Sequence, residues 1–278
     1  MHQENKSDTM KAIIISTEDH ASCNIRNHLL KKGFEDTGEA HAGHPVYQRG
    51  NDRMYTFDKP PVELEDIDTD IDADMFIFAT KHESKAGVPT LSCHAPGNWG
   101  EAMLGGRSDE VCIAPASYLR EAYLHLKQTA QDLDHEVSVE QTHHGPYVKK
   151  PVMFIEIGSE IKAWTNPRYG DMIADAVIHL LDNEPEKKPV AMVLGGGHYN
   201  IPANKVMDRT GYAVGHICAK FLLDNLTEEK MKNAIEKHTE PVELIVLDWK
   251  GLGPAKQHVM DILERIDTPH ERLKNLRE

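Results

Sequence analysis

The chain has 278 residues, of which 40% are hydrophobic and 27% are charged, which allows one large α/β domain or two small ones. Its net charge of −14 argues against a broad nucleic-acid surface, so DNA is not an expected partner and RNA would need a local basic patch. With no apolar run of membrane-spanning length, no signal peptide and four cysteines without a CxxC pair, we expect a cytoplasmic protein with reduced thiols and no membrane partner.

The first element in chain order is a buried strand followed by a helix. Residues 12–17 form a continuous apolar run, and the helix that follows ends at Gly33. This unit is typical of a parallel α/β sheet, in which ligands bind beyond the carboxyl ends of the strands. Residues 18–20 (Glu-Asp-His) occupy that position, although the dipole of a helix favours acidic residues at its N-terminus equally well.

The later elements alternate in a similar way. Further strands are predicted at residues 75–80, 90–94, 136–140, 152–157, 189–194 and 244–248. Helices are predicted at residues 20–32, 115–134, 166–181 and 254–266, and residues 212–223 are expected to become helical towards their end. We therefore predict a mixed, largely parallel central sheet flanked by helices, in a single α/β domain at residues 10–278 that follows a disordered extension at residues 1–9.

One stretch gathers more potential chemistry than any other. It reads Glu140-Gln141-Thr142-His143-His144-Gly145-Pro146. Adjacent side chains of a regular strand point to opposite sides, so His143 and His144 would not face one site. If the strand ends here, Gly145-Pro146 bends the chain and brings both imidazoles to one pocket. The alternative is a loop with two solvated histidines.

Histidines also follow the ends of other predicted strands. Together these histidines are His82, His94, His143, His144 and His198. Strand ends of a parallel sheet meet at one edge, so we expect the imidazoles along one rim. Imidazoles with a carboxylate are good zinc ligands, and a catalytic zinc lowers the pKa of its water to about 7. The spacing matches no known zinc signature, which leaves a metal hydrolase, a metal-free histidine site and a nucleoside-binding protein open.

Two further features bear on the chemistry. Glu156 lies among the apolar residues of strand 152–157, where a carboxylate needs a partner or a metal unless it faces a polar edge. Gly195, Gly196 and Gly197 follow strand 189–194 and allow the close approach of a ligand. They form neither a GxGxxG signature nor a Walker loop, so neither NAD nor ATP is supported.

Four segments together resemble the archaeal- and plant-type D-aminoacyl-tRNA deacylases. They read ATKHESKAG at residues 79–87, SCHAPGN at 92–98, EQTHHGP at 140–146 and GGGHY at 195–199. The resemblance extends from Met10 to about Gly253. It implies a domain similar to the peptidyl-tRNA hydrolase and nucleoside phosphorylase folds, a Zn2+ cofactor, and hydrolysis of the ester between a D-amino acid, such as D-tyrosine, and tRNA.

The resemblance and the residues together give a hypothesis for the site. Zinc ligands are expected among His82, His94, His143, His144 and His198. The expected catalytic residues are His94, Glu140, His144 and Glu83, and the expected substrate-binding residues are Gly195, Gly196, Gly197, Tyr199, Asn98 and Lys81. The expected partner is the 3′ acceptor end of aminoacyl-tRNA, and the protein is expected to be a monomer. The local basic surface that binds the tRNA is expected to include Lys81, Lys85, Lys149, Lys150 and Lys205.

Three alternatives remain at this point. A zinc-dependent peptidase or amidohydrolase would use the same histidines without tRNA. An enzyme resembling nucleoside phosphorylases would need phosphate and ignore chelators. A tRNA-binding module that is not an enzyme would bind tRNA without turnover.

Overall fold

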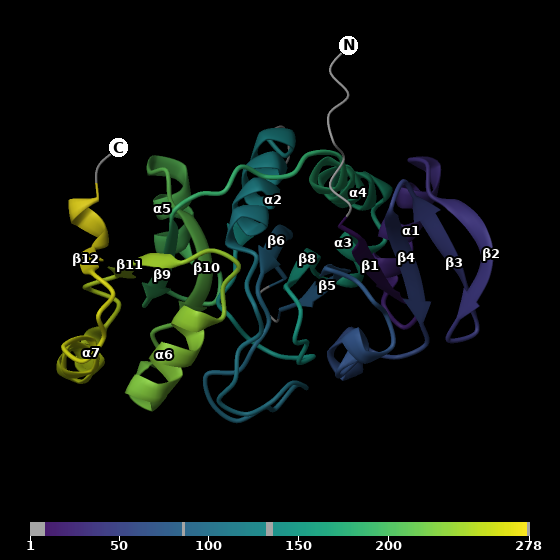
Figure 1. Cartoon of the computed structure of the whole chain (residues 1–278). Helices are drawn as coiled ribbons and strands as arrows, with labels where there is room; N and C mark the ends of the chain where they lie inside the picture. Colours follow the sequence, from purple (N-terminus) through teal and green to yellow (C-terminus); the bar gives the residue numbers. More distant parts are fainter. Residues whose placement is uncertain (1–8, 85–86, 132–135, 277–278) are drawn as a thin grey trace, which may run out of the picture.

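Two β-sheets with their covering helices make up the part of the chain that the computed structural model describes, residues 9–84, 87–131 and 136–276 (Figure 1). The first sheet has the strand order β2-β3-β4-β1-β5-β8-β6-β7, and the second has the order β10-β9-β11-β12. The mixed, largely parallel sheet flanked by helices is thereby confirmed. The extension expected at residues 1–9 lies, apart from its last residue, outside the described ranges.

The strands of the first sheet are β1 (Lys11–Ser16), β2 (Glu35–His41), β3 (His44–Arg49), β4 (Asp52–Phe57), β5 (Met75–Glu83), β6 (Thr90–His94), β7 (Glu136–Val139) and β8 (Val152–Ser159). Those of the second sheet are β9 (Val190–Leu194), β10 (Ala213–Cys218), β11 (Val242–Leu247) and β12 (His270–Arg272). The helices are α1 (His20–Lys31), α2 (Ala116–Thr129), α3 (Ile161–Trp164), α4 (Pro167–Asp182), α5 (Ile201–Arg209), α6 (Glu228–Glu236) and α7 (Lys256–Leu263).

Local sequence explains where the main helices begin. The carboxylate of Asp19 accepts a hydrogen bond from the backbone N–H of Ser22 and so caps α1. Asn166 caps α4 in the same way, and Pro167 occupies the first turn, where no backbone donor is needed. The residues at strand end 18–20 therefore include a helix cap, which was one of the two readings of that segment.

The strands of the first sheet separate two kinds of surface. Ile13, Ile77 and Ile155 are fully buried on the side covered by α1, α2 and α4. Phe78 and Phe154 stack on the opposite side with ring centroids 4.7 Å apart. On this second side the apolar residues give way to polar ones towards the carboxyl end of β5.

The second sheet is parallel throughout its described strands. One of its faces packs on α2 and α5, and the other packs on α6 and α7. Because α2 also covers β6 and β7, one helix joins the cores of both sheets. No helix within the described ranges has both the length and the apolar character that crossing a membrane requires.

The structure differs from the sequence predictions in several elements. Residues 212–223 contain β10 in place of a helix, and a short 3₁₀ turn at Leu223–Asn225 begins at the end of that range. The sequence analysis also did not anticipate α3, α5, α6 or β12. The helix expected at residues 115–134 ends at Thr129, and the last residues of that prediction lie outside the described ranges.

Candidate active site

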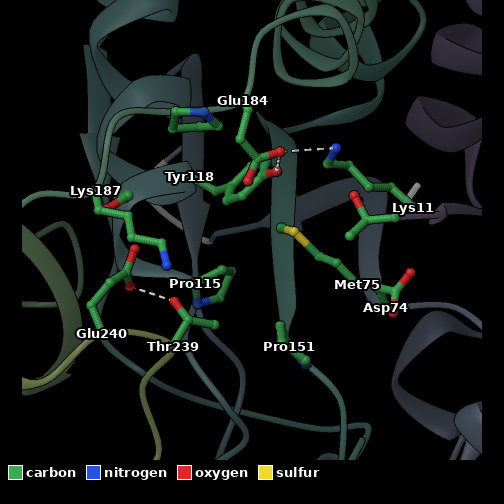
Figure 2. Close-up of a pocket in the computed structure, with 13 residues that line it drawn as sticks. Lys11, Asp74, Met75, Pro115, Tyr118, Pro151, Glu184, Lys187, Thr239 and Glu240 are labelled. Carbon is green, nitrogen blue, oxygen red and sulfur yellow. Dashed lines mark hydrogen bonds and ion pairs between the residues drawn. The ribbon is translucent and has the colours of Figure 1, made fainter. Parts of the chain in front are cut away.

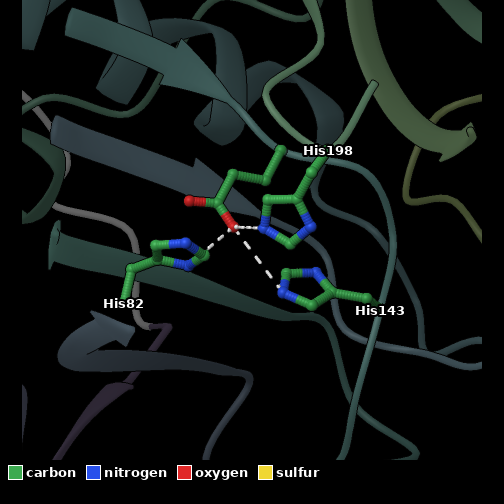
Figure 3. Close-up of side chains that lie close together, drawn as sticks. His82, His143 and His198 are labelled. Carbon is green, nitrogen blue, oxygen red and sulfur yellow. Dashed lines mark hydrogen bonds and ion pairs between the residues drawn. The ribbon is translucent and has the colours of Figure 1, made fainter. Parts of the chain in front are cut away.

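The carboxylate of Glu140, directly after β7, lies at the centre of a group of imidazoles (Figure 3). Its Oε2 atom is 2.9 Å from Nε2 of His198, 3.2 Å from Nδ1 of His82 and 3.6 Å from Nε2 of His143. The side chain of Glu140 is completely buried. Three histidines from separate parts of the chain therefore surround one buried oxygen atom.

A second buried carboxylate, Glu156 on β8, extends the group. Its Oε2 lies 3.4 Å from Nε2 of His94 and 3.7 Å from Nδ1 of His82. Its Oε1 accepts a hydrogen bond of 2.8 Å from the hydroxyl of Thr80. His82 thus lies between two carboxylates, and the imidazole–carboxylate cluster is defined by Glu140, Glu156, His82, His94, His143, His144 and His198.

The cluster lies on a face of the first sheet, so the expectation of imidazoles along one rim was wrong. Glu156 on β8 is paired with Thr80 on β5 and with Ser92 on β6, and His94 is paired with Phe154. Since β6 runs antiparallel to β8, the carboxyl end of β6 reaches the amino-terminal part of β8. The histidines that end β5 and β6 consequently meet over the sheet instead of at a common edge.

The backbone turns at His144, which brings adjacent histidines together. His144 has a φ of +44°, in the left-handed region that non-glycine residues rarely adopt. The rings of His143 and His144 have centroids 4.3 Å apart. A Cβ atom on the following residue, Gly145, would lie 2.1 Å from the backbone nitrogen of Gly106, so the turn also depends on glycine.

Three of the imidazoles have a defined tautomer. The Nδ1 atoms of His94, His143 and His144 face backbone carbonyls, and a carbonyl can only accept, so each Nδ1–H donates. These carbonyls belong to Ala95, Gln141 and Gly145, at 3.2, 2.8 and 2.6 Å. When an imidazole of this group is neutral, its Nε2 therefore carries the lone pair, which is the common arrangement for histidine metal ligands.

The charges of the cluster follow from its contacts. Burial works against a charge on His82, but the neighbouring carboxylates of Glu140 and Glu156 raise its pKa to about 10. Burial also works to raise the pKa of Glu140, yet hydrogen bonds from His198 and His82 hold that pKa well below its ordinary range. Burial and the neighbouring imidazole of His94 lower the pKa of His144 to about 4. The cluster thus holds ionised carboxylates beside a neutral imidazole.

The residues fit a bound metal ion such as zinc. Nε2 of His94, Oε1 of Glu140 and Oε2 of Glu156 are buried without a hydrogen-bond partner among the described residues, and such atoms are rare in folded proteins. Candidate ligand atoms lie within 4.8 Å of one another in three sets. These sets are His94 with His143 and His144, His82 with Glu140, His143 and His198, and His94 with Glu140 and Glu156.

The cluster borders a surface groove at His198. The side chains of Glu140 and His94 are completely buried, whereas that of His198 is 34% exposed. A groove of about 520 Å³ borders His198 and is also lined by Tyr199 and Asn204. Among the imidazoles in contact with Glu140, His198 is therefore the most open to solvent.

Three other predicted site residues do not join the cluster. Glu83 is the neighbour of His82 on β5, so its side chain points the other way, is 71% exposed and pairs with Lys81 at 3.0 Å. The Lys81 ammonium also lies 4.7 Å from the ring centroid of Trp164. The amide of Asn98 donates to the backbone carbonyls of its own loop.

The glycine loop borders the cluster through His198. Gly195 and Gly196 have φ values of +111° and +76°, and a Cβ atom there would lie 2.8 Å from Asp248 or 2.5 Å from Asn200. Both glycines are therefore required by the packing of the loop itself. A Cβ on Gly197 would meet only the carbonyl of Tyr199, at 3.7 Å, so the approach to Gly197 is open.

Sequence reasoning left two residues out of the proposed site. Glu156 carried a signal, because a carboxylate in an apolar strand needs a partner, and its partners are His82 and His94. The side-chain amide nitrogen of Gln141 lies 3.2 Å from Nδ1 of His198, and its backbone carbonyl accepts a hydrogen bond from Nδ1–H of His143. Nothing in the spacing of the sequence indicates that contact.

Another pocket lies at the opposite ends of the strands (Figure 2). Its walls include Lys11 and Met75, which begin β1 and β5. Nζ of the buried Lys11 is 3.5 Å from Oε2 of Glu184, which also accepts a 2.6 Å hydrogen bond from Tyr118. Lys11 is thus already paired with a carboxylate and the pocket lies away from the imidazoles, so the pocket is not our candidate site.

Comparison with known proteins agrees with the resemblance seen in the four segments. The family model for D-aminoacyl-tRNA deacylase matches residues 69–270, a range that contains the whole cluster. The D-aminoacyl-tRNA deacylase of Thermococcus onnurineus is 36% identical over 267 residues, which cover 92% of this chain and 97% of that protein. That of Pyrococcus horikoshii is 37% identical over 269 residues, with the same coverage of both chains.

A solved structure supports the fold. A crystal structure of a conserved protein of unknown function aligns with a TM-score of 0.89 at 26% sequence identity. The alignment covers 97% of this chain and 99% of the other chain. The arrangement of both sheets described above is therefore shared by a second, distantly related protein.

Proposed function

This chain belongs to the D-aminoacyl-tRNA deacylase family, and we propose from this premise that the imidazole–carboxylate cluster is the centre that hydrolyses the ester between a D-amino acid and tRNA. The observation that carries the proposal is the buried carboxylate of Glu140, held among His82, His143 and His198. A protein that acts on aminoacyl-tRNA works where translation takes place, so we also place it in the cytoplasm.

We assign the proton transfers to Glu140. Its Oε2 contacts the imidazoles, whereas its Oε1 has no hydrogen-bond partner among the described residues and is free to bind a water molecule. Glu140 takes a proton from the water as the oxygen of that water bonds to the ester carbon. The same proton passes to the ribose oxygen as the ester C–O bond breaks, which releases the free amino acid and tRNA.

The neighbouring residues hold Glu140 in its ionised form. His82 and His198 contact Oε2 of Glu140, and Gln141 fixes the ring of His198 from its other nitrogen. The ester enters beside His198, the most exposed imidazole in contact with Glu140. Gly197, with open space at its α-carbon, gives the terminal ribose room to lie against the backbone.

We propose a zinc ion as the cofactor, bound by Nε2 of His94, His143 and His144. Support comes from the hydrogen bonds that leave Nε2 of each ring available and from the distances within this set. When bound, zinc would polarise the ester carbonyl and lower the pKa of a coordinated water. A D-tyrosyl ester is the substrate we would test first, with the L-ester rejected because its side chain places the ester out of reach.

The test is hydrolysis of matched D- and L-tyrosyl-tRNA by the purified protein, with and without a zinc chelator. The proposal requires loss of the D-ester only, inhibition by the chelator and recovery with added zinc. Equal hydrolysis of both esters would remove the chiral selectivity. Selective hydrolysis that the chelator leaves unchanged would contradict the role of zinc.

A further inference from the structure

A strongly basic pocket lies at the far edge of the second sheet, away from the first sheet. Its volume is about 390 Å³. Its walls hold five cationic side chains: Lys205 and Arg209 of α5, Lys250 after β11, Arg272 of β12, and Lys274. Asp248 is the one acidic residue among the described residues that line it. In a chain with 31 basic and 45 acidic residues, this local ratio is reversed.

The five cations of the pocket carry unbalanced charge within the part of the chain that the structure describes. Within the described ranges, none of the five has a carboxylate oxygen within the 4.0 Å of an ion pair, although many other lysines and arginines of the chain do. Lys205, Arg209, Lys250 and Lys274 are exposed to solvent. Unpaired cations gathered in one concave surface attract an anion with several charges.

One of the cations is held in position by an aromatic ring. The guanidinium carbon of Arg272 lies 3.7 Å from the ring centroid of Trp249, and the ammonium of Lys256 lies 4.9 Å from the same centroid. Stacking on a ring holds the planar guanidinium in one orientation, in which its N–H groups can donate to two oxygen atoms of a phosphate. Trp249 therefore orders part of the pocket before any ligand arrives.

The basic pocket is continuous with the loop that carries His198. Asp248 lines the pocket and also packs against Gly195, because a Cβ atom on Gly195 would lie 2.8 Å from that of Asp248. A Cβ on Gly251 would lie 3.1 Å from the backbone nitrogen of Gly196. The segment after β11 thus contacts both the pocket and the glycine loop, and His198 follows that loop directly.

We infer that this basic pocket binds backbone phosphates of the acceptor arm of the tRNA while the aminoacylated 3′ end lies at the imidazole–carboxylate cluster. The inference rests on the proposed function. It moves the basic surface away from most of the lysines suggested by the sequence. Lys81 is paired with Glu83, Lys149 lies 3.7 Å from Asp66, and Lys85 falls outside the described residues, which leaves Lys205 inside the basic pocket and Lys150 outside it.

The test compares two double variants with the same change of charge. Lys250→Ala with Lys274→Ala removes two exposed cations of the pocket, and Lys149→Ala with Lys150→Ala removes two exposed cations elsewhere. Binding of uncharged tRNA is measured for both variants and the wild type at several salt concentrations. Hydrolysis is measured on D-tyrosyl-tRNA and on the D-tyrosyl ester of adenosine, which carries no phosphate.

The pocket variant should bind tRNA about tenfold more weakly. The slope of its logarithmic binding constant against the logarithm of salt concentration should fall by the equivalent of about one to two phosphate contacts. Its KM for D-tyrosyl-tRNA should rise by a similar factor with kcat unchanged, and its rate on the adenosine ester should equal that of the wild type. Binding that is equal in the two variants, or a wild type that does not bind tRNA, would overturn the inference. If the pocket variant loses tRNA binding and neither the wild type nor any variant hydrolyses the ester, the result would support the pocket and refute the proposed function.

Discussion

Oε2 of Glu140 and Nε2 of His198 lie 2.9 Å apart although 58 residues separate them and they follow strands of different sheets. The contact joins the segment after β7 to the loop after β9. It also places the most buried carboxylate of the cluster beside an imidazole that is open to solvent.

Glu140→Gln should reduce kcat for D-tyrosyl-tRNA by about 10²- to 10⁴-fold, the usual contribution of a general acid–base residue. The amide keeps the size of the side chain but cannot take a proton from water. Glu83→Gln is the matched control, because Glu83 is exposed and pairs with Lys81, and this variant should keep the wild-type rate. A Glu140→Gln enzyme with full activity would rule out the proposed proton transfers.

His94→Ala should lose bound zinc. Protein purified with zinc and then dialysed should retain the ion in the wild type, and mass spectrometry of the metal content measures this without any assay of activity. His20→Ala changes an exposed histidine outside the cluster and should retain zinc fully. Equal zinc contents in the two variants would show that His94 is not a ligand.

Thr142→Val should destabilise the fold by about 1–3 kcal/mol, measured as the free energy of unfolding in urea. The Thr142 hydroxyl lies 3.0 Å from Nδ1 of His216 and accepts a hydrogen bond from the N–H of Ile217. His216 is fully buried, and valine would leave both partners unsatisfied. Thr129→Val at the exposed end of α2 should change stability by less than about 0.5 kcal/mol, and a similar loss in both variants would contradict this account.

Asp19 should make the protein less stable as the pH rises from about 4 to 6. Burial raises the pKa of Asp19 from 3.8 to about 6, so in this range the folded protein binds more protons than the unfolded chain. Stability relative to the Asp19→Asn variant should fall across this range by up to about 3 kcal/mol. Urea denaturation at several pH values measures the difference, and a constant difference would contradict the raised pKa.

The buried strands were predictable because each is a short run of apolar residues. The run at residues 75–80 became β5, and that at residues 152–157 became β8, since strands buried on both sides need no polar positions. The cluster was partly predictable for a related reason, because Glu140 and Glu156 are carboxylates in or beside such strands. A buried carboxylate requires partners wherever the chain places it.

The direction of a strand cannot be read from its own residues. The sequence of β6 is compatible with either direction, and its antiparallel pairing with β8 decides that His94 lies over the sheet near Glu156. The sequence also does not show to which side a carboxylate points. Glu83 points to solvent and pairs with Lys81, whereas Glu140 points into the protein and is buried.

The segment at residues 212–223 was misjudged because its stabilising contacts are distant in sequence. Gly215 is needed because a Cβ atom there would lie 2.3 Å from Nε2 of His238. His216 contacts the backbone carbonyls of Cys112 and Lys237 through Nε2. β10 pairs with β9, and none of these three partners appears in the local pattern of residues 212–223.

The joining of the two sheets at Glu140 and His198 also has a meaning for synthesis of the chain. A ribosome releases Glu140 well before His198, and the neighbours of β9 in the second sheet, β10 and β11, emerge later still. An unfinished chain therefore holds the carboxylate without its nearest imidazole. The contact between the two sheets at these residues therefore forms only after the loop that follows β9 has left the ribosome.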